Sequence, residues 1–169
     1  MSKPGEKAND KTNDRAAQKR ALRSAARFYA VQALFQMEVS GQTVDQVRVE
    51  FETHRIGIEA EGEAWVEADI AHFRKLVDMA VDDQGRIDQM TDRALVAKWP
   101  ISRIDPTLRA LFRAAGAEFL ETDTPPRVVI TEFVQLTQAF FPEGRESKFV
   151  NAVLDHMARE ARPEAFRTP

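Results

Sequence analysis

The side chains with the clearest chemistry in this sequence are basic and lie near the N-terminus. Lys19, Arg23 and Arg27 recur at every fourth position, so on a helix they would share one face, with Arg20 at its edge. The planar guanidinium of arginine donates two parallel hydrogen bonds to phosphate and also stacks on unpaired bases. This basic arc is a candidate polyanion-binding surface, although charge alone leaves open a solvated face that only aids solubility.

Charge is distributed unevenly along the chain. Residues 1–27 hold eight basic and three acidic side chains, a local net charge of +5. Because the whole chain carries −3, residues 28–169 carry −8. An acidic body argues against general wrapping of nucleic acid, so any contact with a polyanion should be local.

No group of residues indicates catalysis. The sequence has no cysteine, which excludes disulfides and thiolate chemistry, and its three histidines are scattered. Asp69 and His72 have the i, i+3 spacing of helical di-metal carboxylate sites, but such sites need this arrangement twice. We expect a polar surface pair there, no metal, no cofactor and no enzymatic activity.

Length and composition predict one ordinary globular domain. The chain has 169 residues, of which 43% are apolar and 30% are charged. No apolar run approaches the roughly 20 residues needed to span a bilayer, and the N-terminus lacks the apolar stretch of a secretory signal. Together with the absence of cysteine, this favours a cytoplasmic protein without membrane contact.

Apolar periodicity is helical almost everywhere, and sustained strand alternation is absent. It predicts an all-α fold of about seven helices. The helices are expected at about 15–39, from Thr43, along a stripe from Val66 to Ala80, from Ile87 to Trp99-Pro100, and after Asp105-Pro106, Pro125-Pro126 and Ser147. We expect a disordered tail at 1–14, a helical domain at 15–162 and a flexible tail at 163–169.

The first predicted helix is apolar on two faces. Ala26, Ala33 and Met37 lie on one side, while Phe28 and Phe35 lie nearly opposite. Either this helix sits between two layers of its own fold, or a protein partner covers Phe35 or Phe28.

Several segments resemble one family when they are read in order. From Arg23 to Gln36 the sequence reads R-x-x-x-R-F-Y-A-V-Q-A-L-F-Q, and Ile104-Asp105 precedes Leu108-Arg109. Further on come P-x-V-x-I-x-E from Pro126 and S-K-F-V-N-A-V-L-D from Ser147. The order and spacing, from about Arg15 to Ala158, resemble the NusB family of bacterial transcription antitermination factors.

This resemblance implies an all-helical fold of two small packed bundles and a non-enzymatic role. It also implies binding of the boxA RNA element of ribosomal RNA leader transcripts together with NusE, a small-subunit ribosomal protein. The complex would help RNA polymerase read through terminators. A homodimer in the absence of NusE is a further possibility.

Individual positions carry over from the family. Arg23 and Arg27 match its arginine-rich RNA-binding helix, to which the basic arc adds Lys19 and Arg20. Phe140, Lys148 and Phe149 match positions where relatives contact RNA, while Phe35 and Asp105 match positions where relatives meet NusE. Helical spacing leaves core packing open for Phe140 and Phe149, and Asp105 before Pro106 is also a helix N-cap.

Two other functions remain open at the level of sequence. The same fold occurs as a module of RNA cytosine methyltransferases, which continue into a Rossmann-like domain with a glycine-rich turn; we see no such segment before Pro169. A protein-interaction adaptor without RNA binding would require the basic arc to be inert.

Overall fold

The computed structural model describes residues 4–60, 62–98 and 104–167. Within these ranges it contains seven α-helices, a two-stranded antiparallel hairpin and one 3₁₀ turn, which confirms the predicted all-α fold. The elements are α1 (Pro4–Ser40), α2 (Val44–His54), β1 (Glu59–Ala60), β2 (Glu63–Ala64), α3 (Ile70–Asp82), α4 (Gln84–Lys98), α5 (Pro106–Glu121), α6 (Pro126–Phe140), α7 (Ser147–Ala161) and η1 (Pro163–Phe166).

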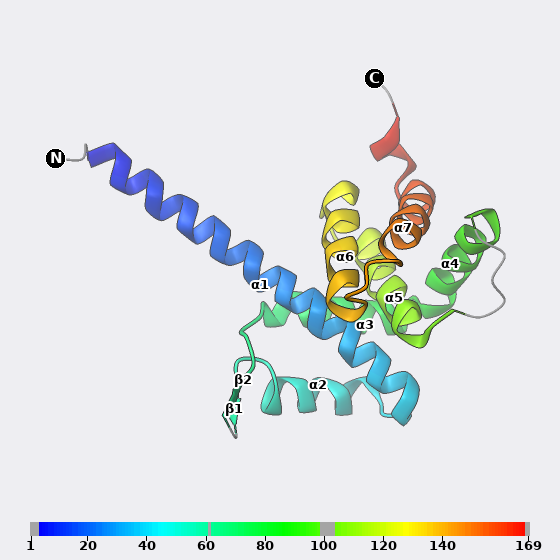
Figure 1. Ribbon diagram of the computed structural model, residues 1–169, viewed down its shortest axis with the longest axis horizontal. Helices are drawn as coiled ribbons and strands as arrows, with labels where there is room; N and C mark the ends of the chain where they lie inside the picture. The colour runs from blue at the N-terminus through cyan, green and yellow to red at the C-terminus, as the bar shows by residue number, and fades with distance from the viewer. Residues whose placement is uncertain (1–3, 61, 99–103, 168–169) are drawn as a thin grey trace.

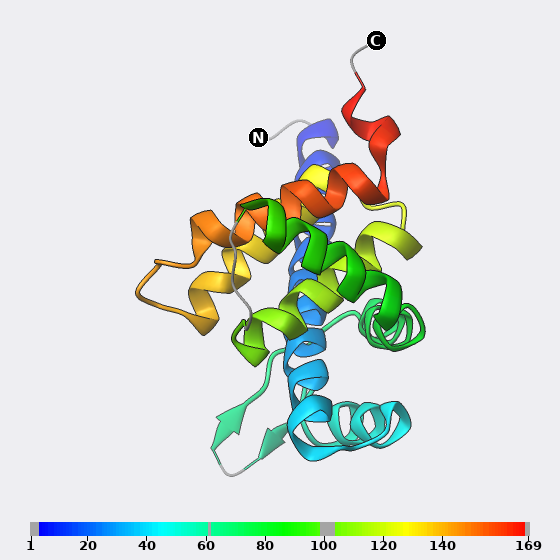
Figure 2. The same cartoon turned by 90° about the vertical axis from the view of Figure 1, so that its right-hand side faces the viewer.

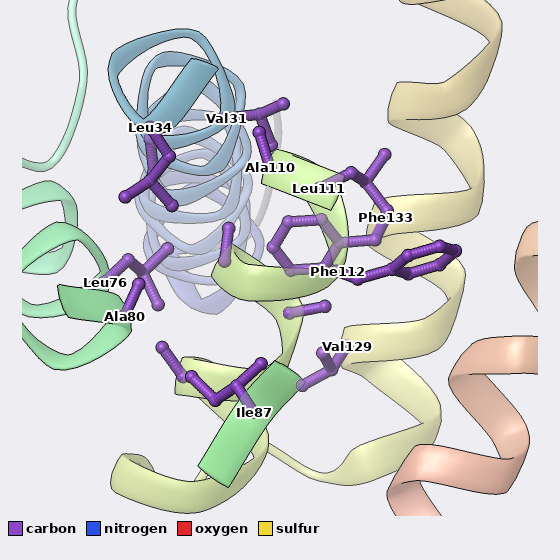
Figure 3. Close-up of a cluster of buried hydrophobic side chains, with 14 of the residues drawn as sticks. Val31, Leu34, Leu76, Ala80, Ile87, Ala110, Leu111, Phe112, Val129 and Phe133 are labelled. Carbon is purple, nitrogen blue, oxygen red and sulfur yellow. The ribbon is translucent and has the colours of Figure 1, made fainter. Parts of the chain in front are cut away.

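The helices form two groups that share α5 (Figures 1 and 2). α1, α2 and α3 pack on one another, α4, α6 and α7 form the second group, and α5 contacts members of both. A single hydrophobic core runs through both groups. Figure 3 shows the middle of this core, where Leu111 and Phe112 of α5 lie among side chains of α1, α3, α4 and α6. The C-terminal half of α1 is thereby packed against α2, α3 and α5.

Local signals in the sequence set several helix starts. The backbone N–H of Gln46 donates to the hydroxyl of Thr43 at 3.2 Å and the Gln46 side chain accepts from Thr43 N–H at 3.0 Å, a reciprocal cap that opens α2. Asp105 accepts from the N–H of Thr107 at 2.7 Å and opens α5, as predicted. Gly41, with φ of 74°, turns the chain at the end of α1.

Helices α4 and α5 approach closely at Gly116. A Cβ atom at this position would lie 2.5 Å from Cγ2 of Ile87, which is well inside van der Waals contact. Glycine is therefore required here for packing and not for backbone freedom.

The ends of the chain differ from expectation. Residues 4–14 continue α1 as a helix and are not a disordered tail, because they prolong a helix already nucleated by packing and Pro4 stands in its first turn. At the other end, residues 163–166 form a 3₁₀ turn, and the guanidinium of Arg159 lies 4.6 Å from the ring centre of Phe166. Residues 1–3 and 168–169 of the two predicted tails lie outside the described residues.

Three smaller expectations also need correction or limits. Val66 does not begin the third helix: it is 64% exposed and precedes Ile70, where α3 starts after an Asp69 cap. Ser147 is the first residue of α7 and not its cap, and the hairpin at 59–64 was too short to show alternation. The predicted stop at Trp99-Pro100 lies outside the described residues.

Candidate RNA and partner surface

The basic arc of α1 is only partly presented to solvent. Lys19 and Arg20 are exposed, and the Arg23 side chain is 40% exposed with its Nε 3.8 Å from an Asp69 carboxylate oxygen. Arg20 and Arg23 help to line a hollow of about 310 Å³, whose lining also includes Arg27, Asp123, Thr124, Pro125, Val128 and Glu132. Guanidinium groups beside the apolar side chains of Pro125 and Val128 can bind a phosphate and shelter a base edge.

Arg27 does not belong to this exposed arc, which corrects its predicted role in RNA contact. Its side chain is 3% exposed, and Nε and Nη2 each donate to a carboxylate oxygen of Glu118 at 2.8 Å. Nη1 lies 3.5 Å from a carboxylate oxygen of Glu132. The four-residue spacing placed Arg27 on the basic ridge, but α1 enters the core between Arg23 and Arg27, so the same ridge passes from solvent to interior.

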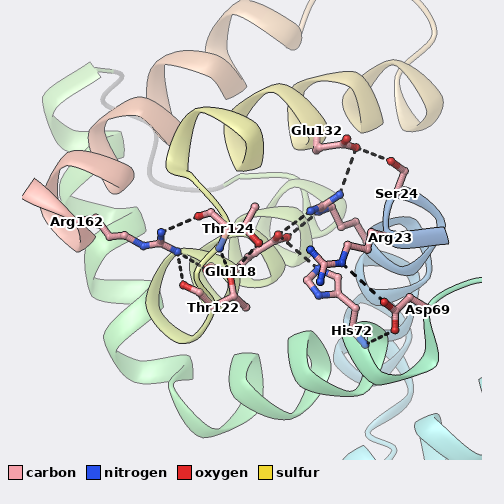
Figure 4. Close-up of polar contacts among 10 residues, drawn as sticks. Arg23, Ser24, Asp69, His72, Glu118, Thr122, Thr124, Glu132 and Arg162 are labelled. Carbon is pink, nitrogen blue, oxygen red and sulfur yellow. Dashed lines mark hydrogen bonds and ion pairs between the residues drawn. The ribbon is translucent and has the colours of Figure 1, made fainter. Parts of the chain in front are cut away.

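Glu118 is the centre of a buried ionic network (Figure 4). His72 Nε2 lies 3.4 Å from its carboxylate, and Ser24 donates at 2.8 Å to Glu132 at the edge of the network. Burial alone would raise the pKa of Glu118, but the hydrogen bonds and charge of Arg27, together with nearby His72, outweigh it and lower this pKa to about 2. The network joins α1, α3, α5 and α6, and it fixes α1 at Ser24 and Arg27, directly after the exposed part of the basic arc.

The predicted surface pair of Asp69 and His72 is also wrong in part. Asp69 caps α3 by accepting from the backbone N–H of His72 at 3.0 Å, but His72 itself is 8% exposed and faces Glu118. Among the described residues there is no cluster of three or more histidine, aspartate or glutamate side chains placed to hold a metal.

Arg162, which the sequence analysis did not single out, fastens the loop beside the arginine-lined hollow. Its guanidinium donates to four backbone carbonyls at the end of α5 and in the loop that follows: those of Glu118, Phe119, Thr122 and Thr124, at 2.6–3.0 Å. Helix C-termini leave such carbonyls without partners. The only signal in the sequence was a basic residue just beyond a helix, which is too common to interpret.

A second surface lies at the other end of α1, where an apolar groove of about 460 Å³ opens. Its lining comes from α1, α6, the end of α2 and the start of α5: Val31, Gln32, Phe35, Gln36, Val39, Arg55, Thr107 and Phe140. Phe35 is half-buried, and Val39 at one end is 62% exposed. An open apolar groove with a few polar groups at its rim is suited to a protein partner.

The structure groups Phe140 with Phe35 and not with the basic arc. The Phe140 ring stacks on Phe28 with centroids 5.2 Å apart and planes 12° apart, and it lines the apolar groove. Asp105 is exposed at the start of α5, two residues before Thr107 of the same groove. Phe35 therefore lines the groove and Asp105 lies near its Thr107 end in sequence, while their role in partner binding stays a prediction.

Lys148 and Phe149 lie at the start of α7, apart from both the basic arc and the groove lining. Lys148 is exposed. Phe149 is half-buried and packs edge-on against Phe112 with centroids 6.3 Å apart, so its ring is largely engaged with the core.

No helix among the described residues is long and apolar enough to cross a membrane. The fold and these two surfaces define a helical binding module with one basic and one apolar contact region. They contain no assembled nucleophile, base and orienting group within the described residues.

Comparison with known proteins identifies the family. A family model described as the NusB family matches residues 24–159, so the chain belongs to the NusB family. Transcription antitermination protein NusB of Agrobacterium fabrum is 48% identical over 146 residues, covering 86% of this chain and 88% of that protein. The protein of the same name from Rhodopseudomonas palustris is 47% identical over 146 residues and covers 85% of each chain.

Solved structures agree with this assignment. T. maritima NusB has a TM-score of 0.65 and 28% identity, covering 85% of this chain and 95% of that one. A chain from the crystal structure of antitermination factors NusB and NusE in complex with dsRNA has a TM-score of 0.61 and 26% identity, covering 81% and 96%. The family assignment confirms the prediction of a non-enzymatic protein.

Proposed function

We propose that this chain acts in bacterial transcription antitermination, as a factor that binds RNA together with a NusE-type ribosomal protein. The observation that carries the proposal is the division of α1: exposed cations occupy its middle and a half-exposed aromatic groove its C-terminal end. Relatives named as antitermination proteins, matched over nearly nine tenths of their length, support this function over the methyltransferase alternative.

The RNA contacts are assigned to Lys19, Arg20 and Arg23. Arg20 and Arg23 flank the hollow beside Pro125, while Lys19 extends the positive surface along the helix. Lys148 and Phe149 are proposed as a second, smaller contact at the start of α7. The RNA that the family resemblance implies is the boxA element of ribosomal RNA leaders, bound in the cytoplasm as it is transcribed.

The partner contacts are assigned to the groove around Phe35. Phe35 and Phe140 supply apolar surface, and Asp105 at the rim supplies a negative charge suited to a basic ribosomal protein. A second copy of the chain could occupy the same groove in the absence of NusE. The resulting complex with NusE and RNA is proposed to join RNA polymerase during antitermination.

A titration of labelled boxA RNA, with and without NusE, tests the proposal. Arg20→Glu should weaken RNA binding, whereas Arg86→Glu, an equal charge reversal at an exposed position on α4, should not. Three phosphate contacts predict a slope of about −2 for log affinity against log salt. Equal effects of the two reversals, or an affinity independent of salt, would contradict the assignment and favour an adaptor without RNA binding.

A further inference from the structure

The N-terminal part of α1 extends beyond the body of the protein. Every residue from Asp10 to Ala21 is exposed, and the first fully buried residue is Ala26. Figure 1 shows this stretch, in dark blue, projecting away from all other helices. We call residues 10–21 the arm; its 12 residues rise about 18 Å. Because the side chains of the arm are exposed, they are available to bind a partner.

Three of the four basic residues of the arm form one ridge, and the fourth, Arg20, lies about 120° from the centre of that ridge. Lys11, Arg15 and Lys19 are four residues apart, and Arg23 continues the series at the body. Each step rises about 6 Å and turns about 40°, so the four side chains span an arc of roughly 120° on one side of the helix. Within the part of the chain that the structure describes, Lys11, Arg15 and Lys19 are not paired with any carboxylate.

The acidic residues of the arm lie on the opposite side. Asp10 and Asp14 project roughly 120–160° from the centre of the basic arc when 100° is allowed per residue. Three cations of the arm therefore share one face, and both of its carboxylates lie away from that face. A helix that served only solubility would have no need of this segregation, whereas a helix that binds a polyanion along one side would.

The arm also lies outside the region that the family model matches. The family model begins at residue 24, so Lys11 and Arg15 both precede the residues that it matches. Lys11 also precedes the segment whose spacing resembles the family, so the family match assigns it no contact.

We infer that the arm binds the phosphate backbone of RNA next to the stretch held by the body, with Lys11 and Arg15 as its contacts. This inference rests on the proposed RNA-binding function. The basic ridge continues from Lys11, Arg15 and Lys19 to Arg23, which lines the arginine-lined hollow. An RNA strand that leaves this hollow along α1 would therefore meet the basic face of the arm. Phosphate contacts of this kind add affinity and position the strand without reading its sequence.

The test uses the full chain with NusE and two single-stranded RNAs, boxA alone and boxA with flanking nucleotides. Lys11→Gln/Arg15→Gln removes two cations and keeps good helix formers, which circular dichroism checks. On the flanked RNA, the slope of log affinity against log salt should be about 1.4 less steep for the variant than for wild type. The ratio of wild-type to variant affinity should therefore fall about sevenfold between 50 and 200 mM salt. On boxA alone the two proteins should bind alike.

A charge transplant provides the matched control. Adding Asn13→Lys and Ala17→Lys to the double variant restores the net charge on the opposite face of the arm. If the basic face is the site, the transplant stays weak on flanked RNA. Full recovery of affinity would overturn the assignment to that face.

Failure of the arm and failure of the proposed function give different results. If wild type binds flanked boxA RNA and the double variant matches it in affinity and salt slope, the inference about the arm is wrong while the proposed function stands. If RNA binding is unchanged but assembly with RNA polymerase weakens, the arm meets an acidic protein and the RNA assignment is overturned. If wild type binds no boxA RNA, the proposed function falls and the arm's role falls with it.

Discussion

Replacing Arg27 by methionine should destabilise the fold without removing an RNA contact. Methionine keeps an unbranched stem but lacks the guanidinium that donates twice to Glu118, whose side chain is fully buried. The variant would leave the Glu118 carboxylate in the core with only His72 at 3.4 Å. An unpaired buried charge is costly, because the interior solvates it poorly.

Two independent arguments give a similar magnitude. Removing one partner of a buried ion pair typically costs about 3–5 kcal/mol. The pKa of Glu118 is lowered from 4.5 to about 2, and at 1.36 kcal/mol per unit this corresponds to roughly 3 kcal/mol. Because the folded pKa lies below the unfolded one, this stabilisation is present above pH 4.5 and is lost as the pH falls from there towards 2. We therefore expect Arg27→Met to cost about 3 kcal/mol at pH 7.

Urea unfolding at pH 7 and in steps down to about pH 2.5 provides the assay. Arg27→Met should be less stable at pH 7 and should lose less further stability on acidification than wild type. The double variant Arg27→Met/Glu118→Met should recover much of the loss, because it removes both charges. RNA affinity of the folded Arg27→Met protein should stay close to wild type. Wild-type stability combined with a clear loss of RNA affinity would refute this reasoning and return Arg27 to the RNA surface.

Three further predictions test the positioning of the two surfaces. Arg162→Met should cost about 2–3 kcal/mol in urea unfolding, because two carbonyls at the end of α5 and two in the loop that follows lose a charged donor. Gly116→Ala should destabilise by about 1–3 kcal/mol through overpacking, whereas Gly85→Ala, in open space on α4, should be neutral or stabilise by up to about 1 kcal/mol; changes of the same sign would contradict the packing argument. Phe35→Ala should weaken NusE binding by more than about 1 kcal/mol with little change in Tm, and a large fall in Tm with unchanged affinity would remove Phe35 from the interface.

The helices could be predicted because their determinants are local. The Thr43–Gln46 capping box and the Asp105-Pro106 start each act over a few residues, and both appear in the structure as expected. The start of α1 was predicted too late, because residues 4–14 extend a helix that is nucleated by packing of its C-terminal half. The composition of residues 4–14 does not show that packing. Local signals therefore predicted the helix starts that carry a cap, but not a helix start that depends on packing elsewhere in the chain.

The exposure of the basic arc could not be predicted from residue spacing. Phe35 lines an open groove, whereas the ridge containing Arg27 passes into the core. Residues spaced by four share a helix face whether that face is exposed to solvent or buried. The buried partner of Arg27, Glu118, lies 91 positions away in the sequence. Only the tertiary structure shows at which residue α1 passes from solvent into the core.

The two apolar faces of α1 illustrate how both interpretations of one pattern can hold at different residues. Phe28 is covered from within the chain by the stacked ring of Phe140, which is the intramolecular layer that one interpretation required. Phe35, two turns further on, is left half-exposed in the groove that the same Phe140 ring helps to line, which is what a partner would require. The Phe140 ring therefore packs on Phe28 with one part of its surface and lines the proposed partner groove with another. A partner that docks on Phe35 would thus contact a surface already held rigid by the fold, so little ordering entropy should oppose binding.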